Sequence, residues 1–200
     1  TYLLKGDSTA TTNKTLKAKS AGFEGTWSGQ GTGTAKFTVK ELKVGDEVTI
    51  AGTKYGVSDT AENVLKAATG KAALAAGDTV TINGTTYNVV DDADVDHNAK
   101  KYKADEVKDL LNANKENTVN GKTYGVGTLE GYDTAANLYT KIGNEIAKAS
   151  SIGTDTAATV TKNDNVFTVV EGTVAVNKAV SLDLHVGADS YTSNKISMDI

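Results

Sequence analysis

The chain has 200 residues and a formal net charge of −4, contains no Cys and no Pro, and all of its basic residues are Lys. Without Cys, a disulfide framework, a thiolate metal site and a thiol nucleophile are excluded. The acidic balance argues against a nucleic-acid-binding protein, which needs a basic face. The apolar runs, such as residues 166–170, are far shorter than the roughly 20 residues that span a bilayer, so we expect no membrane insertion.

Residues 1–40 are predicted to form the first part of a β-rich base. The segment begins with many Thr, Ser, Gly and Lys residues, and Ala35, Phe37 and Val39 then alternate as a short strand. Residues 29–33 are rich in Gly, but a phosphate-binding loop would be followed by a helix rather than by a strand. A flexible loop is therefore the favoured interpretation.

A repeated unit is the most informative feature of the middle of the chain. Residues 45–57 align without a gap on residues 77–89, and residues 117–126 form a weaker third copy. Asn-Gly between alternating segments, as at Asn83-Gly84, is a strong hairpin signal, because a type I′ turn needs positive φ at both central residues. Each copy is therefore predicted to be a β-hairpin.

The second copy also predicts its own strand register. With a two-residue loop at Asn-Gly, Val80 lies opposite Tyr87. One face of this hairpin then carries the apolar side chains Val80, Ile82, Tyr87 and Val89. The tyrosines at the equivalent position of the three copies, whose rings we expect to point toward the helix that follows, are Tyr55, Tyr87 and Tyr124. In the third copy Asn117 replaces the Val opposite the tyrosine, so a shorter or frayed hairpin is expected.

A helix is predicted after each hairpin, because the apolar spacing changes from two residues to about three and a half. The predicted bounds are a cap at Ser58, Asp59 or Thr60 and an end near Gly70, then about residues 104–114, then a cap at Asp133 or Thr134 and an end before Gly153. The apolar faces are Ala61, Val64, Leu65 and Ala68 in the first helix; Ala104, Val107, Leu110 and Leu111 in the second; and Ala135, Leu138, Tyr139, Ile142, Ile146 and Ala149 in the third.

The sequence thus predicts an α+β fold of antiparallel strand-strand-helix repeats with β-rich terminal segments. Residues 41–155 are expected to form an outer lobe of three hairpin-plus-helix units. Each helix is expected to lie across its own hairpin, because a single hairpin does not bury its own apolar face. Residues 1–40 and 156–200 are the β-rich base segments, and if they pair, the two ends of the chain lie close together.

Strand patterns continue through the last part of the chain. Val160, Phe167 and Val169 alternate on the two sides of a predicted turn at Asn163-Asp164. A terminal hairpin is predicted from the alternation of Leu182, Leu184 and Val186, a turn around residues 188–194, and the alternation of Ile196, Met198 and Ile200.

One acidic segment, residues 91–98, is a candidate metal site. Oxygen-bearing side chains recur there as at the start of a calcium loop, at Asp91, Asp92, Asp94, Asp96 and Asn98. Counted from Asp92, however, the sixth position is His97 instead of Gly and the twelfth is Lys103 instead of Glu. A solvated acidic loop before a helix is therefore favoured, although the sequence leaves calcium binding open.

No catalytic, cofactor-binding or metal-binding residue is predicted, and we expect that the chain is not an enzyme. His97 and His185 lack the His-Glu-x-x-His spacing, and no Ser or Thr has the positioned base of a Ser-His-Asp set. Asn13-Lys14-Thr15 and Asn83-Gly84-Thr85 match the N-glycosylation pattern, whereas O-linked sugars on Ser or Thr are the favoured form in a bacterial setting.

Two segments carry a resemblance to a known family. Residues 77–87, followed by a capped helix, resemble the short IN motif of flagellin outer domains and of the filament-capping protein. Leu184-His185-Val186-Gly187-Ala188-Asp189 is similar to the Leu-Gln-Val-Gly-Ala-Asn strand of the core region of bacterial flagellins, with His185 in place of Gln and Asp189 in place of Asn. The chain therefore resembles the hypervariable outer region of a flagellin, and residues 1–40 lie outside the resemblance.

This resemblance implies a secreted structural protein that decorates the extracellular filament of the bacterial flagellum, which serves motility. It implies other flagellin subunits as partners, through filament-forming terminal helices that these 200 residues do not contain, so the chain is not expected to polymerise alone. Antibodies and host surfaces are the other expected partners. The alternative is an extracellular adhesin or phage-fibre type binding module, which a cluster of exposed aromatic residues beside the acidic loop would favour.

Overall fold

The computed structural model describes residues 25–29, 34–174, 181–185 and 195–199, the last two segments by their backbone. These residues form a mixed α+β fold, which confirms the predicted fold class. The described helices are α1 (Ala61–Thr69), α2 (Ala104–Ala113) and α3 (Ala135–Ser150), together with the short 3-10 helix η2 (Asp92–Asp94).

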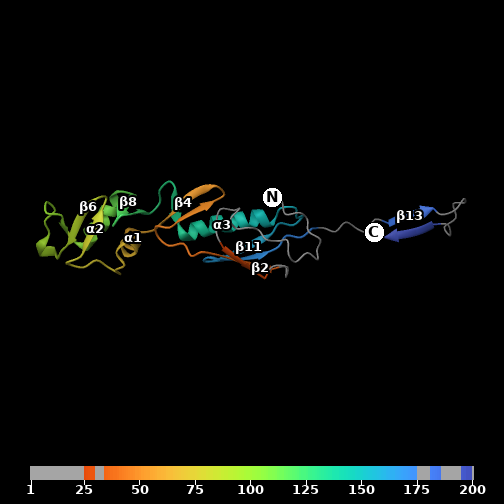
Figure 1. Ribbon diagram of the computed structural model, residues 1–200, viewed down its shortest axis with the longest axis horizontal. Coiled ribbons are helices and arrows are strands. Elements are labelled where there is room, and N and C mark those ends of the chain that lie inside the picture. The colour runs from red at the N-terminus through yellow and green to blue at the C-terminus, as the bar shows by residue number, and fades with distance from the viewer. Residues whose placement is uncertain (1–24, 30–33, 175–180, 186–194, 200) are drawn as a thin grey trace.

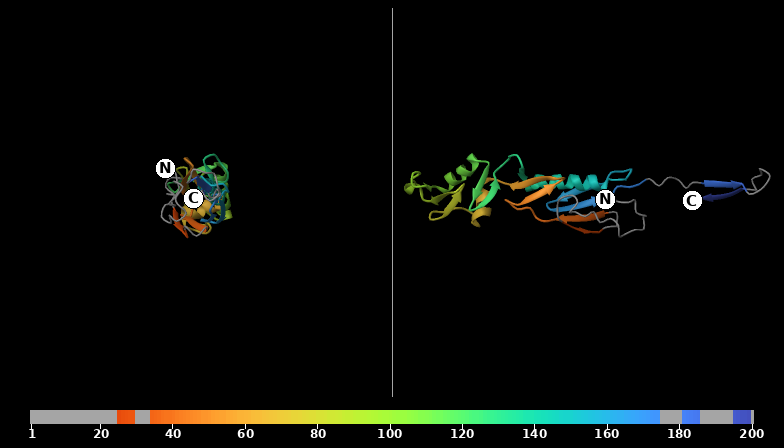
Figure 2. Two further views of the ribbon diagram at one scale, coloured as in Figure 1. Left: turned by 90° about the vertical axis from the view of Figure 1, so that its right-hand side faces the viewer. Right: turned by 45° about the horizontal axis from the view of Figure 1, so that its top comes forward.

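The described part of the chain between residues 25 and 174 is elongated, with two lobes in line (Figure 1, Figure 2). We call residues 61–126 the distal lobe, and residues 25–58 and 132–174, as far as they are described, the base lobe. Each lobe has its own cluster of buried apolar side chains. The described residues therefore form two small cores rather than one large one.

All three predicted hairpins are present. Their strands are β3 (Glu47–Ile50) with β4 (Thr53–Ser58), β5 (Thr79–Ile82) with β6 (Thr85–Val89), and β8 (Glu116–Val119) with β9 (Lys122–Gly125). Val80 lies opposite Tyr87 as predicted. The turn residues Asn83 and Gly84 have φ values of 50° and 81°, as a type I′ turn requires.

The three hairpins also share a hydrogen bond just outside their paired strands, which supports the repeat. In each, the valine two residues after the tyrosine donates its N–H to the carbonyl that precedes the first strand. These bonds join Val57 to Asp46 (2.8 Å), Val89 to Asp78 (2.8 Å) and Val126 to Lys115 (2.7 Å).

The first and third helices begin with one shared motif, Asp-Thr-Ala-x-Asn, at residues 59–63 and 133–137. In both, the Thr Oγ1 accepts the N–H of the Asn at 3.3 Å. The Asp Oδ1 accepts the Thr N–H and the Asn Nδ2, so the Asp and Thr side chains together satisfy two backbone N–H groups at the start of each helix. The caps predicted for α1 and α3 are therefore confirmed as Thr60 and Thr134.

A four-stranded antiparallel sheet in the order β1-β2-β12-β11 forms much of the base lobe. Its strands are β1 (Gly25–Ser28), β2 (Thr34–Val39), β12 (Val166–Val170) and β11 (Thr159–Asn163). β2 pairs with β12, and the buried residues Phe37 and Phe167 lie opposite each other. The expected pairing of the two base segments is thus confirmed for these strands. The turn between β11 and β12 is Asp164-Asn165, one residue later than predicted.

The predicted outer lobe of residues 41–155 does not form one core. Hairpin β3–β4 packs with α3 and the base sheet, whereas α1 and hairpin β8–β9 pack in the distal lobe. Within the described residues, the second unit is the one whose helix, α2, packs on its own hairpin. The helices have similar apolar faces, so the local pattern does not select the hairpin that each one covers.

Because α1 and α3 do not cover their own hairpins, the expected direction of two tyrosine rings is wrong. Tyr55 packs against the base core, and Lys141 Nζ of α3 lies 5.6 Å from its ring centre. Tyr124 is buried in the distal core, away from the α3 core. Their rings therefore do not face the helices that follow them, although their strand positions are equivalent as predicted.

The distal lobe contains a five-stranded sheet in the order β7-β6-β5-β8-β9, where β7 is Lys101–Tyr102. Helices α1 and α2 pack on it through buried side chains, including Val64 and Leu111. The third hairpin is complete rather than frayed, because the buried Asn117 is satisfied. Its Nδ2 donates to the carbonyl of Leu111 at 3.0 Å and to that of Asn114.

Hairpins β5–β6 and β8–β9 meet at their turns, a contact that we call the seam. β5 and β8 pair directly at Ile82 and Val119. Beyond this pair, the side-chain carbonyl of each turn Asn accepts a backbone N–H of the other hairpin: Asn83 Oδ1 from Thr118 (2.8 Å) and Asn120 Oδ1 from Thr81 (3.0 Å). These two side-chain hydrogen bonds therefore extend the contact between β5 and β8 beyond their one paired position.

Tyr132 lies where the two lobes join. It begins β10 (Tyr132–Thr134), which pairs in parallel with β4 to form the sheet β10-β4-β3. Its ring lies on Gly56 of β4 and Gly125 of β9, where an added Cβ would stand 2.3 Å and 2.4 Å from ring atoms. Gly at these two repeat positions is therefore required by close approach, whereas the second repeat carries Asn88 there.

The terminal hairpin is present as β13 (Ser181–His185) and β14 (Lys195–Asp199). Leu182 lies opposite Met198, and Leu184 opposite Ile196. Val186, Ile200, the turn around residues 188–194 and the start of the chain at Thr1 lie outside the described residues. The same holds for most of the flagellin-like segment at residues 184–189.

Candidate functional site

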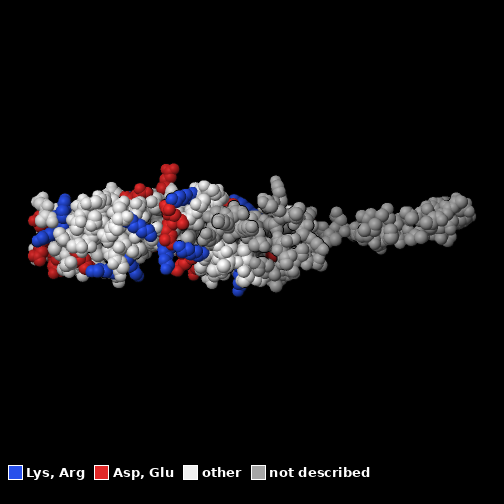
Figure 3. Space-filling view, in the orientation of Figure 1, with Lys and Arg blue, Asp and Glu red and all other residues white. Residues whose placement is uncertain are grey.

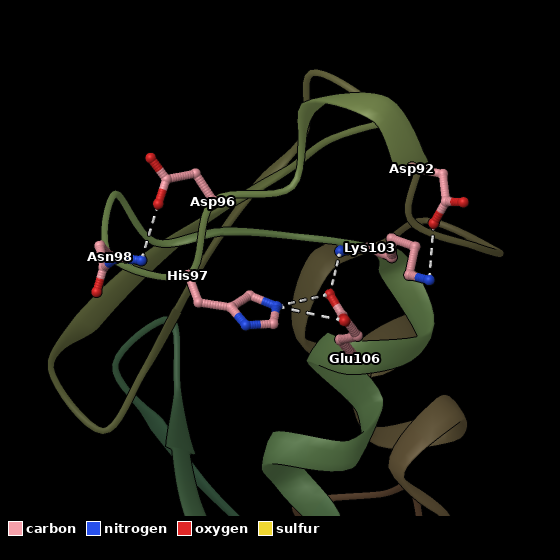
Figure 4. A network of polar contacts seen from close by, with 6 residues as sticks. All are labelled: Asp92, Asp96, His97, Asn98, Lys103 and Glu106. Atoms are coloured by element: carbon pink, nitrogen blue, oxygen red, sulfur yellow. Dashed lines mark hydrogen bonds and ion pairs between the residues drawn. The ribbon is translucent and has the colours of Figure 1, made fainter.

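The candidate site is the loop between the second hairpin and α2, in the distal lobe (Figure 4). After β6 the chain forms η2, turns back, and enters α2 through β7, which pairs in parallel with β6. Asp96 and Lys101 exchange two backbone hydrogen bonds of 3.2 Å and 2.9 Å, which close the loop. The acidic segment therefore has a defined shape.

Glu106 is the centre of the polar network of this loop (Figure 4). Its Oε2 accepts the backbone N–H of Lys103 at 2.9 Å, which satisfies a free donor at the start of α2. Both of its carboxylate oxygens lie 3.3 Å from His97 Nε2. Lys103 Nζ also pairs with Asp92 Oδ1 at 2.8 Å. One carboxylate thus connects the loop to the helix.

Asp96 uses its carboxylate within the loop itself. Its Oδ1 accepts the N–H groups of Asn98 at 3.1 Å and Ala99 at 3.3 Å. Asp92 is turned to Lys103, so these two carboxylates do not converge. Among the described residues, no three His, Asp or Glu side chains are arranged to hold a metal ion. Calcium binding, which the sequence leaves open, finds no support in this geometry.

Two carboxyl groups at the loop, those of Asp92 and Glu106, have their pKa lowered by hydrogen bonds from Lys103. A hydrogen bond from Lys103 Nζ lowers the pKa of Asp92, and one from the backbone of Lys103 lowers the pKa of Glu106. Asp92 in turn raises the pKa of Lys103. The side chains of Asp92 and Lys103 are 84% and 45% exposed, so their ion pair contributes little to stability. These interactions therefore favour the charged forms of Asp92, Glu106 and Lys103.

An aromatic cluster lies beside this acidic loop. The ring of His97 stacks on Tyr102 with centroids 4.5 Å apart, and Tyr102 meets Tyr87 edge-on at 5.1 Å. The side chain of His97 is 55% exposed, and both tyrosines are half-buried. A partly exposed stacked pair next to carboxylates is able to contact the apolar face of a ligand while offering hydrogen-bond acceptors.

A groove of about 240 Å³ lies between α1 and α2 on the same lobe. Its apolar residues include Leu65, Leu74 and Ala104. Two lysines on its rim are already paired, Lys71 with Asp78 and Lys108 with Asp105. The groove therefore presents mixed charges and selects no single class of ligand.

Charged side chains gather in two places on the face shown in Figure 3, at the far end of the distal lobe and in a band between the lobes. Ion pairs on the neighbouring elements join Lys54 to Glu47 at 2.8 Å and Lys141 to Asp133 at 3.4 Å. Both signs are interspersed among the described residues on this face, so it does not present the basic stripe that nucleic acids require.

The other residues that the sequence singles out do not join this site. Asn83, in the second glycosylation pattern, uses its carboxamide in the seam. The Gly-rich segment is described as far as Gly29, and residues 30–33 lie outside the described residues. Asn13, in the first glycosylation pattern, also lies outside them. Of His185 the structure describes the backbone in β13.

Sequence reasoning missed two features that the structure makes important. The Asp-Thr-Ala-x-Asn caps recur with a spacing that a motif search would find. Tyr132 has no such signal by itself, but Gly56 and Gly125 follow a tyrosine in two of the three repeats, which indicates that something lies close to the backbone there.

Comparisons with protein-family models, with characterised proteins and with solved structures found no match to this chain. The helices in the described part of the chain are all too short or too polar to cross a membrane.

Proposed function

We propose that this chain is the surface-exposed outer domain of a bacterial flagellin, a structural protein that decorates the extracellular filament used in motility. The observation that carries the proposal is the path of the chain through β2 and β12. These strands flank the repeats in sequence but are neighbours in one sheet, with the distal lobe at the far end (Figure 1). A domain inserted into a parent protein leaves and returns at neighbouring points in this way.

The repeated hairpins and the mild surface chemistry also support this proposal. The IN-like turn at Asn83 is a part of the seam that builds the distal lobe, so the motif has a structural role. His97 makes its hydrogen bonds to Glu106, and the described residues place no Ser or Thr hydroxyl within hydrogen-bond distance of it. A structural domain therefore fits these residues better than a hydrolase does. Its partners are other flagellin subunits, and the surface is open to antibodies and host surfaces.

Immunogold electron microscopy tests the proposal. Antibodies raised against the purified 200-residue chain are applied to cells that produce the full-length protein, with antibodies pre-absorbed on the same chain as the control. Gold along the flagellar filaments is the expected result. Gold over the cell wall or fimbriae, or gold restricted to phage-infected cells, would overturn it in favour of an adhesin or a phage fibre.

The aromatic cluster favours a second candidate function, an adhesin or phage-fibre type module that captures a glycan at the loop. His97, Tyr102 and the neighbouring carboxylates supply a stacking surface and hydrogen-bond acceptors. A glycan array probed with the chain tests this function. Binding that is lost in His97→Ala and kept in Asn112→Ala, an exposed residue of α2, supports it. No binding by the unmodified chain contradicts it.

A further inference from the structure

The two Asn-Gly turns of the seam are chemically reactive sequences. In an Asn-Gly pair the backbone nitrogen of Gly attacks Cγ of Asn, because Gly has no side chain to hinder the approach. An N–Cγ bond forms and the Cγ–Nδ2 bond breaks; the Gly nitrogen gives up its proton to solvent, and Nδ2 takes up a proton and leaves as ammonia. Water then opens the resulting succinimide to aspartate or isoaspartate. We propose that Asn83 and Asn120 are latent deamidation sites that the seam keeps unreacted in the folded chain.

Burial does not protect either residue. Asn83, Gly84, Asn120 and Gly121 are all exposed at the turns, so water reaches them. Both asparagines also have positive φ, 50° and 47°, in tight two-residue loops. Protection must therefore come from the orientation of the carboxamides.

Hydrogen bonds hold both ends of each carboxamide toward the neighbouring part of the lobe. Asn83 Oδ1 accepts the N–H of Thr118 at 2.8 Å, and its Nδ2 donates to Asn117 Oδ1 at 3.1 Å. Asn120 makes the equivalent pair, accepting from Thr81 at 3.0 Å and donating to the carbonyl of Ala68 at 3.3 Å. Attack by the following Gly requires the carboxamide to turn back and give up both bonds. The reaction at each asparagine is therefore limited by release of its own carboxamide from these bonds.

Deamidation would also prevent the seam from closing again. A carboxylate at position 83 has no N–H to donate, and one of its oxygens would face the acceptor Asn117 Oδ1. Isoaspartate adds a backbone atom to the turn and shifts the strand register. The first hairpin, with Ala51-Gly52 at its turn, has neither the reactive pair nor a carboxamide in the seam. The modification thus acts on the distal lobe.

The test measures deamidation at both sites by peptide mapping and mass spectrometry. The full 200-residue chain is incubated at neutral pH in native buffer and in concentrated urea. We expect the deamidation rate of both asparagines to be lower in native buffer than in urea by about tenfold or more, because reaction in the folded chain must wait for local opening. Equal rates in native buffer and in urea would overturn the proposal.

Comparison of the two sites within one variant separates the local effect from general stability, because Asn117→Ala also removes the donations from Asn117 Nδ2 to the carbonyls of Leu111 and Asn114. Asn117→Ala removes the acceptor of Asn83 Nδ2 and leaves the two hydrogen bonds of Asn120 in place. With folding verified by circular dichroism, Asn83 should react several-fold faster while Asn120 keeps its slow rate. Equal acceleration at both sites in a folded variant would contradict a protection built from these particular bonds. The native and urea rates of the unmodified chain decide the proposal even where the variant does not fold.

Discussion

Asn83 and Asn120 each accept a backbone N–H of the other's hairpin, at 2.8 Å from Thr118 and 3.0 Å from Thr81. Backbone bonds run in the opposite sense, from Asn83 N–H to Thr118 O at 2.8 Å and from Asn120 N–H to Thr81 O at 2.9 Å. The arrangement is reciprocal, so one residue type at one turn position both forms a hairpin and joins two of them. The first hairpin carries Ala51 at this position and belongs to another sheet.

Replacing Asn83 or Asn120 by Gly tests the energetic weight of the seam. Gly tolerates the positive φ of the turn but lacks the carboxamide, so each variant loses side-chain hydrogen bonds only. We expect each to lower the free energy of unfolding by roughly 1–2 kcal/mol, measured by urea denaturation. Ala51→Gly is the matched control. Ala51 has a φ of 50° and should gain or keep stability as Gly; a loss equal to that of the Asn variants would argue against the seam.

Tyr132 and Gly125 should show strong coupling in a double-mutant cycle. Gly125→Ala alone places a Cβ 2.4 Å from the Tyr132 ring, which should cost about 1–3 kcal/mol. In a Tyr132→Ala background the space is open, so the same change should cost much less. Thermal unfolding followed by circular dichroism measures all four proteins. Additive effects would mean that the ring does not lie on this glycine.

The raised pKa of Tyr132 predicts that the free energy of unfolding falls at high pH. Burial, followed by the nearby carboxylates of Glu116 and Glu47, raises its pKa from 10.0 to about 12. Between these values the unfolded chain releases the phenol proton while the folded chain keeps it, so rising pH favours unfolding. Tyr132→Phe has no such proton. Its free energy of unfolding should fall less steeply than that of the unmodified chain from pH 10 to 12, whereas parallel curves would refute the assignment.

Calcium should leave the melting temperature unchanged relative to a magnesium control at equal ionic strength. Asp92 is paired with Lys103, and Asp96 accepts N–H groups of its own loop, so their oxygens are not free to converge on an ion. A ligand at a hundred times its dissociation constant would stabilise the fold by about 2.7 kcal/mol, which a thermal melt detects. A calcium-specific shift that disappears in Asp94→Ala would show that the loop rearranges to bind the ion.

Local features of the fold were predictable from the sequence. The register of Val80 and Tyr87, the caps at Thr60 and Thr134 and the alternation in β2 depend on neighbours within a few residues. The acidic loop was also predictable as a loop before a helix. Its aromatic cluster was not, because Tyr87 and Tyr102 meet through parallel pairing of β6 and β7 across the loop.

The sequence by itself therefore determined the hairpins, the helices and the two or three residues among which the caps of α1 and α3 lie, since turn chemistry, apolar period and capping side chains act over short distances. The tertiary structure alone decided which helix covers which hairpin. α1 and α3 both offer an apolar face, but α1 packs in the distal core and α3 in the base core, on either side of the point where the chain crosses between the lobes. At that crossing the ring of Tyr132 lies on Gly125 and on Gly56, which is far away in the chain, and this steric fit exists once both lobes are assembled.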